Sequence, residues 1–256
     1  MERRALRRLL VLAILVIPLV GLNAYPAVAA DSHHGPRALI APIGTEPAGQ
    51  TYGRWAAEWW QWALGIPAAT NPILDTTGAH CAQRQVDKVW FLAGSFGPDP
   101  VVRNCDVPAG KALFFPLINY FYGAFLNDPP ETRTEEFVRN AGSCTVPAEI
   151  SVEIDGFMVH RPTRFFTGAS GSQSPIFNVQ LPPGNVFGGV PEPPAPDGDP
   201  PPPPHIPELV LSPSAEQGYY LFVRPLSPGA HTIRWTASGC NPGFSQDITY
   251  HLMVGN

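Results

Sequence analysis

The chain has 256 residues, of which 14% are charged, and its formal net charge is −5 at pH 7. This acidic balance argues against nucleic acid as a partner, because nucleic-acid binding depends on Lys and Arg that neutralise phosphates. It disfavours adhesion to anionic lipid for the same reason. The 32 prolines and 24 glycines favour short strands joined by ordered loops over long solvated helices.

The first thirty residues have the pattern of a secretory signal peptide. Four arginines within residues 1–8 precede an apolar stretch at 9–22, and small residues at 27–30 come before a polar segment. The apolar stretch is shorter than the roughly 20 residues of a membrane-spanning helix, so we expect no stable membrane span after cleavage. The signal peptide predicts export to the periplasm or the medium, with cleavage after Ala29 or Ala30. Cleavage would also change the net charge from −5 to −8, because four arginines and one glutamate are removed.

The first predicted element of the exported part is a helix at residues 51–64, TYGRWAAEWWQWAL. Trp55, Trp59 and Trp62 fall at i, i+4 and i+7, which places them on one helical face. Thr51 can cap the start of this Trp-rich helix.

Most of the remaining chain has the pattern of short strands, apart from a second, shorter helix predicted at residues 130–141. Residues 88–93 and 112–118 are continuous apolar runs, as in strands covered on both faces, and Pro116 favours an edge or a bulge. Further strands are predicted at residues 149–155, 176–181, 219–224, 231–237 and 247–254. About seven short strands with one or two short helices predict a mainly β protein, an antiparallel β-sandwich or jelly roll.

Residues 190–207 contain the segment PEPPAPDGDPPPPPHIP, which cannot pair inside a sheet because proline lacks the N–H group. The three strands predicted after this segment are too few for a separate core. We therefore expect a single β-sandwich domain over residues 31–256, with a proline-rich loop inserted at 190–207.

Four cysteines in an exported chain predict two disulfide bonds. They allow three pairings, and spacing alone does not choose among them. We favour Cys81–Cys105, which would close a local loop, and Cys144–Cys240, which would tie the middle of the chain to its C-terminal strands. A zinc site is disfavoured because no C-x-x-C pair is present.

Several segments of the exported part resemble a group of exported bacterial β-rich proteins with a Trp-rich N-terminal helix. The segments are WAAEWWQWALG, VWFLAG, GKALFFPLIN, PLSPGAHTIRW and DITYHLMV. The Trp-rich helix is the most distinctive of them. The resemblance implies a shared secreted β-rich fold and carries over no catalytic residue.

Aromatic residues are the first candidates for ligand binding, because exposed rings can stack on sugar rings. The candidate ligand-binding residues are Trp55, Trp59, Trp60, Tyr120 and Tyr122. Large aromatics at helical spacing more often belong to a core, so the alternative is that the Trp-rich face covers the open side of the sandwich.

Glu58 lies among the tryptophans and is a candidate catalytic residue. Indole rings around a carboxyl group raise its pKa, which is one way to obtain a general acid. A glycosidase also needs a second carboxylate at roughly 5–9.5 Å. Asp75, Asp87, Asp106, Glu149 and Glu153 are available for that role, and nothing in the sequence singles out one of them.

His80, His231 and His251 are further candidates for catalysis. Strand alternation places His231 on the same face as Trp235, where we expect it to be half-buried, and His251 opposite the apolar face of its strand. No H-x-H or H-E-x-x-H spacing is present, so we expect hydrogen-bonded structural histidines.

A metal site is conceivable only at the new N-terminus. Cleavage after Ala30 would place His33 third in the chain, and a free amine with a third-position imidazole suits Cu(II) or Ni(II). The alternative is a polar chain end with no such role.

These observations favour a secreted, non-catalytic protein that binds a polysaccharide or another cell-envelope ligand through aromatic-lined loops, without a cofactor. One alternative is a secreted hydrolase that uses Glu58 as general acid or base. The other is a purely structural surface protein. No complete catalytic motif decides whether the protein is an enzyme.

Overall fold

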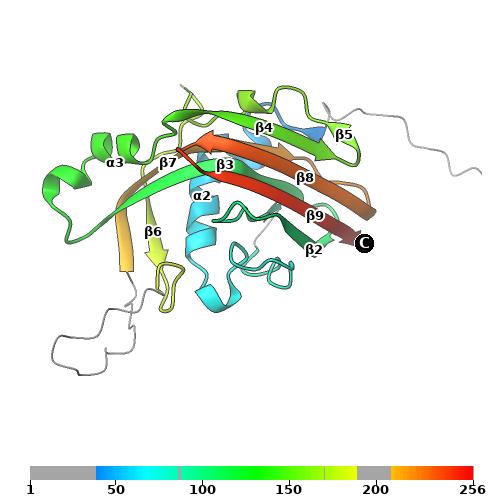
Figure 1. Ribbon diagram of the computed structural model, residues 1–256, viewed down its shortest axis with the longest axis horizontal. Coiled ribbons are helices and arrows are strands. Elements are labelled where there is room, and N and C mark those ends of the chain that lie inside the picture. The colour runs from blue at the N-terminus through cyan, green and yellow to red at the C-terminus, as the bar shows by residue number, and fades with distance from the viewer. Residues whose placement is uncertain (1–38, 86–87, 170, 189–208, 256) are drawn as a thin grey trace, which may run out of the picture. The chain divides into compact units, whose positions relative to one another are not determined.

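The computed structural model describes residues 39–85, 88–169, 171–188 and 209–255 (Figure 1). These residues all belong to one unit, His34–Asn256. The predicted signal peptide, the proposed metal ligand His33 and the proline-rich loop at 190–207 lie outside the described residues.

The predicted Trp-rich helix is present as α2, Tyr52–Leu64. It begins at Thr51, whose side chain accepts a hydrogen bond from the amide N–H of Arg54. The predicted second helix is divided into a 3-10 turn, η3 (Pro130–Arg133), and a short α-helix, α3 (Glu135–Ala141). The division lies at Thr134, which has an extended backbone and caps α3 through the amide N–H of Phe137. Three further 3-10 turns are η1 (Pro47–Gly49), η2 (Ala68–Thr70) and η4 (Pro162–Arg164).

The described strands form two sheets. In spatial order, the first sheet contains β1 (Val89–Phe91), β3 (Ala112–Phe125), β7 (Leu209–Val223) and β6 (Phe177–Leu181). The second contains β2 (Val101–Pro108), β9 (Ser245–Gly255), β8 (Gly229–Cys240), β4 (Val146–Ile154) and β5 (Phe157–Met158).

The mainly β class is confirmed. The prediction of antiparallel sheets holds only in part, because each sheet contains one parallel pair of strands. β1 pairs in parallel with β3, and β2 pairs in parallel with β9. Between β1 and β3 the chain crosses into the second sheet as β2 and then returns, so β3 enters the first sheet in the same direction as β1. A parallel pair needs such a crossover, and here a strand that the sequence did not reveal supplies it.

The first eight residues of the long strand β3 are buried on both faces, because α2 lies across one face of the first sheet and the second sheet covers the other (Figure 1). Phe114 packs towards α2, with its ring centroid 5.8 Å from that of Tyr52. The next residue, Phe115, packs the other way, 5.0 Å from Trp235 of β8. The register with β7 shifts between Pro116 and Ile118, which confirms the bulge that was one of two expectations for Pro116.

Both favoured disulfides are present, Cys81–Cys105 and Cys144–Cys240. Disulfides are typical of proteins that fold in an oxidising compartment. Within the described ranges, no helix is long and apolar enough to cross a membrane.

We expect the Cys144→Ala/Cys240→Ala double variant to lose more stability than Cys81→Ala/Cys105→Ala. The first bond joins residues 96 apart in sequence and the second joins residues 24 apart. Loop-closure entropy alone then gives losses of about 4.7 and about 3.4 kcal/mol. Urea denaturation of the two double variants measures the difference. An equal or larger loss for the shorter loop would contradict the entropic ordering.

Candidate ligand-binding site

A pocket of about 380 Å³ opens beside α2, between the middle of β3 and the turn that joins β8 to β9. We call it the aromatic pocket. Its size is within the range of small-molecule sites. Its lining residues are Trp59, Trp60, Leu64, Ile73, Gly94, Ser95, Phe96, Asn119, Tyr120, Phe121, Phe187, Asn241, Pro242, Gly243, Phe244 and Gln246.

The pocket is open beside β3 because β1 is short. β1 pairs only with residues Ala112–Phe114 of β3. Beyond Phe114, β3 has no strand beside it on that side among the described residues. Asn119, Tyr120 and Phe121 lie on this unpaired part of β3 and form one wall.

The two neighbouring tryptophans of α2 have different roles at the pocket. Trp59 is fixed in the core, because its indole N–H donates a hydrogen bond of 2.9 Å to the carbonyl oxygen of Leu92. Trp60 stacks on Phe121, with ring centroids 4.8 Å apart. Its indole nitrogen is buried and faces the Tyr220 hydroxyl without a hydrogen bond of normal geometry.

Buried polar atoms without partners gather at this pocket. Three of the eight such side-chain atoms among the described residues belong to its lining: Trp60 Nε1, Asn241 Nδ2 and Gln246 Oε1. A buried polar atom left without a partner costs roughly 1–3 kcal/mol, and such atoms are rare in native proteins. Each of these atoms is buried beneath the pocket surface, so they mark polar groups packed behind the aromatic lining.

Gly94 has no side chain, and the side-chain amide of Gln246 occupies the space that a side chain at position 94 would fill. A Cβ atom at position 94 would lie 2.6 Å from Gln246 Oε1 and 3.2 Å from its Nε2. A side chain here would therefore displace the Gln246 amide. The glycine of the VWFLAG segment thus helps to shape the pocket wall.

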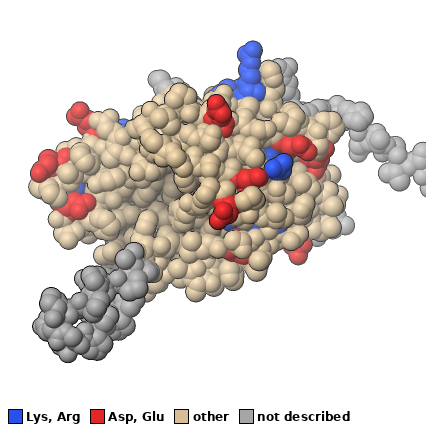
Figure 2. Space-filling view, viewed as in Figure 1, with Lys and Arg blue, Asp and Glu red and all other residues tan. Residues whose placement is uncertain are grey.

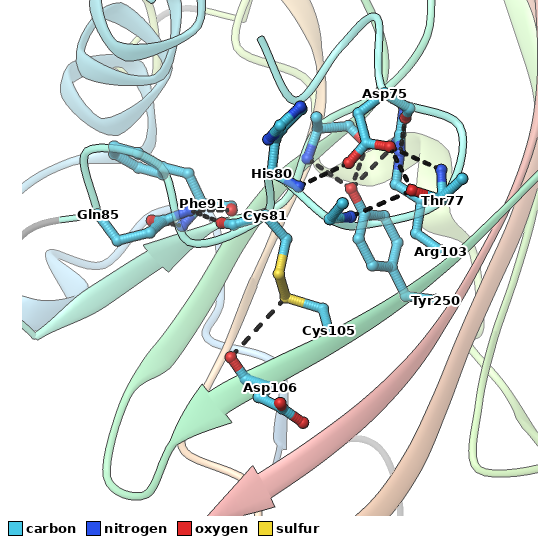
Figure 3. Close-up of a disulfide and its surroundings, with 12 residues drawn as sticks. Asp75, Thr77, His80, Cys81, Gln85, Phe91, Arg103, Cys105, Asp106 and Tyr250 are labelled. Carbon is cyan, nitrogen blue, oxygen red and sulfur yellow. Dashed lines mark hydrogen bonds between the residues drawn. A yellow bond between two sulfur atoms is a disulfide. The ribbon is translucent and has the colours of Figure 1, made fainter. Parts of the chain in front are cut away.

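Arg103 of β2 holds the same wall from behind, next to the Cys81–Cys105 disulfide (Figure 3). Its guanidinium donates to the carbonyl oxygens of Ala93 and Gly94 at 2.7 and 3.0 Å. It also donates to the Tyr250 hydroxyl at 3.0 Å. Only 1% of Arg103 is exposed, so these bonds fix the backbone from which Ser95 and Phe96 reach the pocket.

Of the predicted ligand-binding residues, the structure brings Trp59, Trp60 and Tyr120 together at the aromatic pocket. Trp55 and Tyr122 are not part of its lining. Trp55 is buried and donates to the carbonyl oxygen of Pro47 at 2.9 Å, and Tyr122 packs 5.7 Å from Phe137 of α3.

The stripe of Trp55, Trp59 and Trp62 on α2 belongs to the core, because all three side chains are buried. The indole N–H of Trp62 donates to the carbonyl oxygen of Gln83 at 2.8 Å. This arrangement is the core alternative that the helical spacing allowed, and it leaves Trp60 as the tryptophan of α2 with an unpartnered indole nitrogen.

Glu58 lies on the outer side of α2 with Arg54 and Gln61, and it is half-buried. It does not line the aromatic pocket. Within the described residues no hydrogen bond or ion pair involves its carboxylate.

The three candidate histidines also lie away from the pocket. His231 is half-buried as expected and contacts Asp155 Oδ2 at 2.7 Å and the carbonyl oxygen of Ser227 at 2.8 Å. His251 is exposed, and the backbone N–H of His80 donates to Asp75. No group of three or more His, Cys, Asp or Glu side chains suited to a metal ion is found in the described part of the chain.

A buried hydrogen-bond network behind the pocket was missed by the sequence analysis. Glu216 of β7 is 1% exposed, and its Oε2 accepts a hydrogen bond of 2.7 Å from the Tyr220 hydroxyl. The Tyr220 oxygen accepts one of 3.0 Å from Asn119 Nδ2, and Asn119 lines the pocket. Burial raises the pKa of Glu216 to about 7, although hydrogen bonds from Tyr220 and Thr167 act in the opposite direction.

No protein-family model matches the chain, and no curated protein matches it. Among solved structures, the chain has a similarity to the cysteine protease inhibitor EhICP2 from Entamoeba histolytica. The TM-score is 0.19 and the identity 13%, over 59% of this chain and 85% of the inhibitor. A similarity this low supports no inference about fold or function.

Proposed function

We propose that the protein is a secreted, non-catalytic binding protein whose aromatic pocket holds a sugar unit of a neutral glycan. The observation that carries this proposal is a pocket lined by aromatic rings and side-chain amides without any charged group. A sugar ring offers an apolar face that stacks on aromatic side chains and hydroxyl groups that hydrogen-bond to amides. Export is supported by the signal-like residues 1–30 and by the two disulfides.

The charge of the site favours a neutral ligand. The lining contains no Asp, Glu, Lys, Arg or His. On the face drawn in Figure 2, charged side chains are few and wide uncharged surface lies between them. A charged ligand would lose its hydration in such a pocket without gaining an opposite charge, which is unfavourable.

The same composition favours binding without catalysis. Bond cleavage in a glycan needs a carboxylate or another general acid within reach of the glycosidic oxygen. The lining has none, and Glu58 is outside it. A hydrolase that uses Glu58 remains the alternative proposal, and the release of sugar distinguishes it from binding alone.

Phe187→Ala is expected to weaken glycan binding by about 2- to 13-fold, since one aromatic contact contributes roughly 0.5–1.5 kcal/mol. Phe187 lines the pocket and is 52% exposed, so its truncation leaves the core intact. The matched control is Phe157→Ala, because Phe157 is 53% exposed but lies on β5, outside the pocket.

The measurement is co-sedimentation of the mature protein with a panel of insoluble polysaccharides and cell-wall preparations, followed by fluorescence titration with soluble fragments of those retained. Retention that falls for the Phe187 variant and not for the Phe157 control supports the proposal. Released sugar in the supernatant would favour the hydrolase. Absence of retention across the panel would overturn glycan binding and favour a structural surface protein.

A further inference from the structure

We infer that Glu216, acting through Tyr220, fixes the orientation of the Asn119 side-chain amide and so makes the aromatic pocket select a ligand hydroxyl that donates a hydrogen bond. This inference rests on the proposed glycan-binding function. It adds two positioning residues that do not line the pocket and assigns Asn119 the role of choosing the ligand.

The direction of each hydrogen bond follows from the carboxylate. Above about pH 7 Glu216 is ionised, and an ionised carboxylate only accepts hydrogen bonds, whereas a tyrosine hydroxyl has a single proton to donate. Glu216 Oε2 lies 2.7 Å from the Tyr220 oxygen, so the Tyr220 proton is committed to the carboxylate. The Tyr220 oxygen is then left as an acceptor.

The surroundings of the Tyr220 oxygen agree with that role. Asn119 Nδ2 donates to it at 3.0 Å. This bond requires the Tyr220 oxygen to act as an acceptor. The hydroxyl is fully buried, so water does not compete for this position.

The Asn119 amide is therefore held with its nitrogen towards Tyr220. A side-chain amide has its acceptor opposite its donors, so Oδ1 is directed away from Tyr220. No hydrogen bond to Oδ1 is found within the described residues, and Asn119 lines the pocket. The pocket thus presents a fixed acceptor at β3, and a ligand group that can only accept has no partner there.

Gln246 and Asn241 also place side-chain amides in the pocket lining. Their unpartnered atoms, Gln246 Oε1 and Asn241 Nδ2, are buried beneath the pocket surface, so Asn119 Oδ1 is the acceptor assigned to the ligand. A sugar ring with free hydroxyls can donate to it, whereas a sugar methylated or fluorinated at that position lacks the donor.

The first experiment examines the free protein by NMR at pH 8, where Glu216 is ionised. In the wild type we expect nuclear Overhauser contacts between the Asn119 side-chain amide protons and the Tyr220 ring, and slow exchange of those protons with water. In Tyr220→Phe the exchange is expected to rise at least about 10-fold, because the amide loses its acceptor. The matched control is Tyr52→Phe, which removes another buried hydroxyl outside the pocket, where Tyr52 donates to the carbonyl oxygen of Ala41. Fast exchange in the wild type, or the same exchange in Tyr220→Phe, would overturn the positioning.

The second experiment uses methyl β-D-glucopyranoside and its analogues in which each hydroxyl in turn is replaced by hydrogen or by fluorine. At one ring position we expect both replacements to weaken binding to the wild type by about 10-fold, because fluorine accepts but does not donate. In Tyr220→Phe the fluorine penalty at that position should fall to about 3-fold or less, since the released amide can turn its N–H towards fluorine. In Tyr52→Phe the fluorine penalty at that position should be the same as in the wild type.

The two experiments separate the inference from the function on which it rests. If no glucoside shifts the resonances of the pocket and no polysaccharide of the panel is retained, sugar binding is overturned and the selection is overturned with it, while the exchange data still decide the Asn119 orientation. If glucosides bind but the fluorine penalty is the same in Tyr220→Phe as in the wild type, the binding function stands and the selection by Asn119 is overturned.

Discussion

Arg103→Met is expected to lower the free energy of unfolding by about 4 kcal/mol, which is at the upper end of the range for single substitutions. The guanidinium is 1% exposed and donates to the carbonyl oxygens of Ile73, Asp75, Ala93 and Gly94. Methionine fills similar space but has no donor, so these carbonyl oxygens would stay buried without this partner. Each such loss costs roughly 1–3 kcal/mol, and the removal of a buried charge offsets only part of the sum.

Arg234→Met is the matched control, since it removes the same group from the outer surface. Arg234 pairs with Asp247 at 3.2 Å, and its side chain is 55% exposed. Exposed pairs of this kind contribute about 0–1 kcal/mol. Urea denaturation of both variants gives the comparison. Similar losses for the two would show that the carbonyl oxygens around residue 103 find water once the guanidinium is gone.

The same arginine explains why β2 was not predicted. Within Val101–Pro108 the inward positions are Val101, Arg103, Cys105 and Val107, whereas Val102 faces outward. A charge at a buried position and an apolar residue at an exposed one remove the period-two pattern by which strands are recognised. The parallel pairing of β1 with β3 was therefore not predicted either, because that pairing depends on the crossover through β2.

Only the last part of β7 was predicted as a strand, for a related reason. The strand begins at Leu209, but only residues 219–224 were predicted, because Ser214, Glu216 and Pro213 give the first half the composition of a loop. Ser214 and Glu216 are in fact buried, at 0% and 1% exposure. Polar residues that point into the protein form hydrogen bonds that local sequence cannot reveal, since the partners of Glu216 come from other segments and from positions several residues away.

The aromatic part of the site was easier to predict from the sequence than its polar part. Trp60 lies off the buried stripe of α2, and an off-stripe aromatic residue on an otherwise packed helix indicates a second surface. Asn119, Asn241 and Gln246 carry no such signal, because amides are common in loops and at strand ends. They meet only through the short length of β1 and the position of the β8–β9 turn.

Glu216→Gln is expected to abolish most of a pH dependence that the wild type shows between about pH 4.5 and 7. Burial raises the pKa of Glu216 from 4.5 to about 7 in the folded protein. Within this window the folded protein retains a proton that the unfolded chain has lost, so the stability of the wild type falls as the pH rises and levels off above about pH 7. The loss amounts to roughly 3 kcal/mol, at 1.36 kcal/mol per pKa unit.

Glutamine is neutral at every pH and can still accept from the Tyr220 hydroxyl, so the stability of the variant relative to the wild type should increase across this window. Urea denaturation at intervals from pH 4 to pH 8 measures the two profiles, with Glu153→Gln on the exposed face of β4 as the control. Arg139 of α3 lowers the pKa of Glu216. In Arg139→Gln the free energy of unfolding should therefore continue to fall to a higher pH than in the wild type. Parallel profiles for wild type and Glu216→Gln would mean that water reaches the carboxylate and that its pKa is not raised in the folded protein. The carboxylate would then be ionised and accept the Tyr220 proton at lower pH as well, so the orientation of the Asn119 amide would hold over a wider pH range.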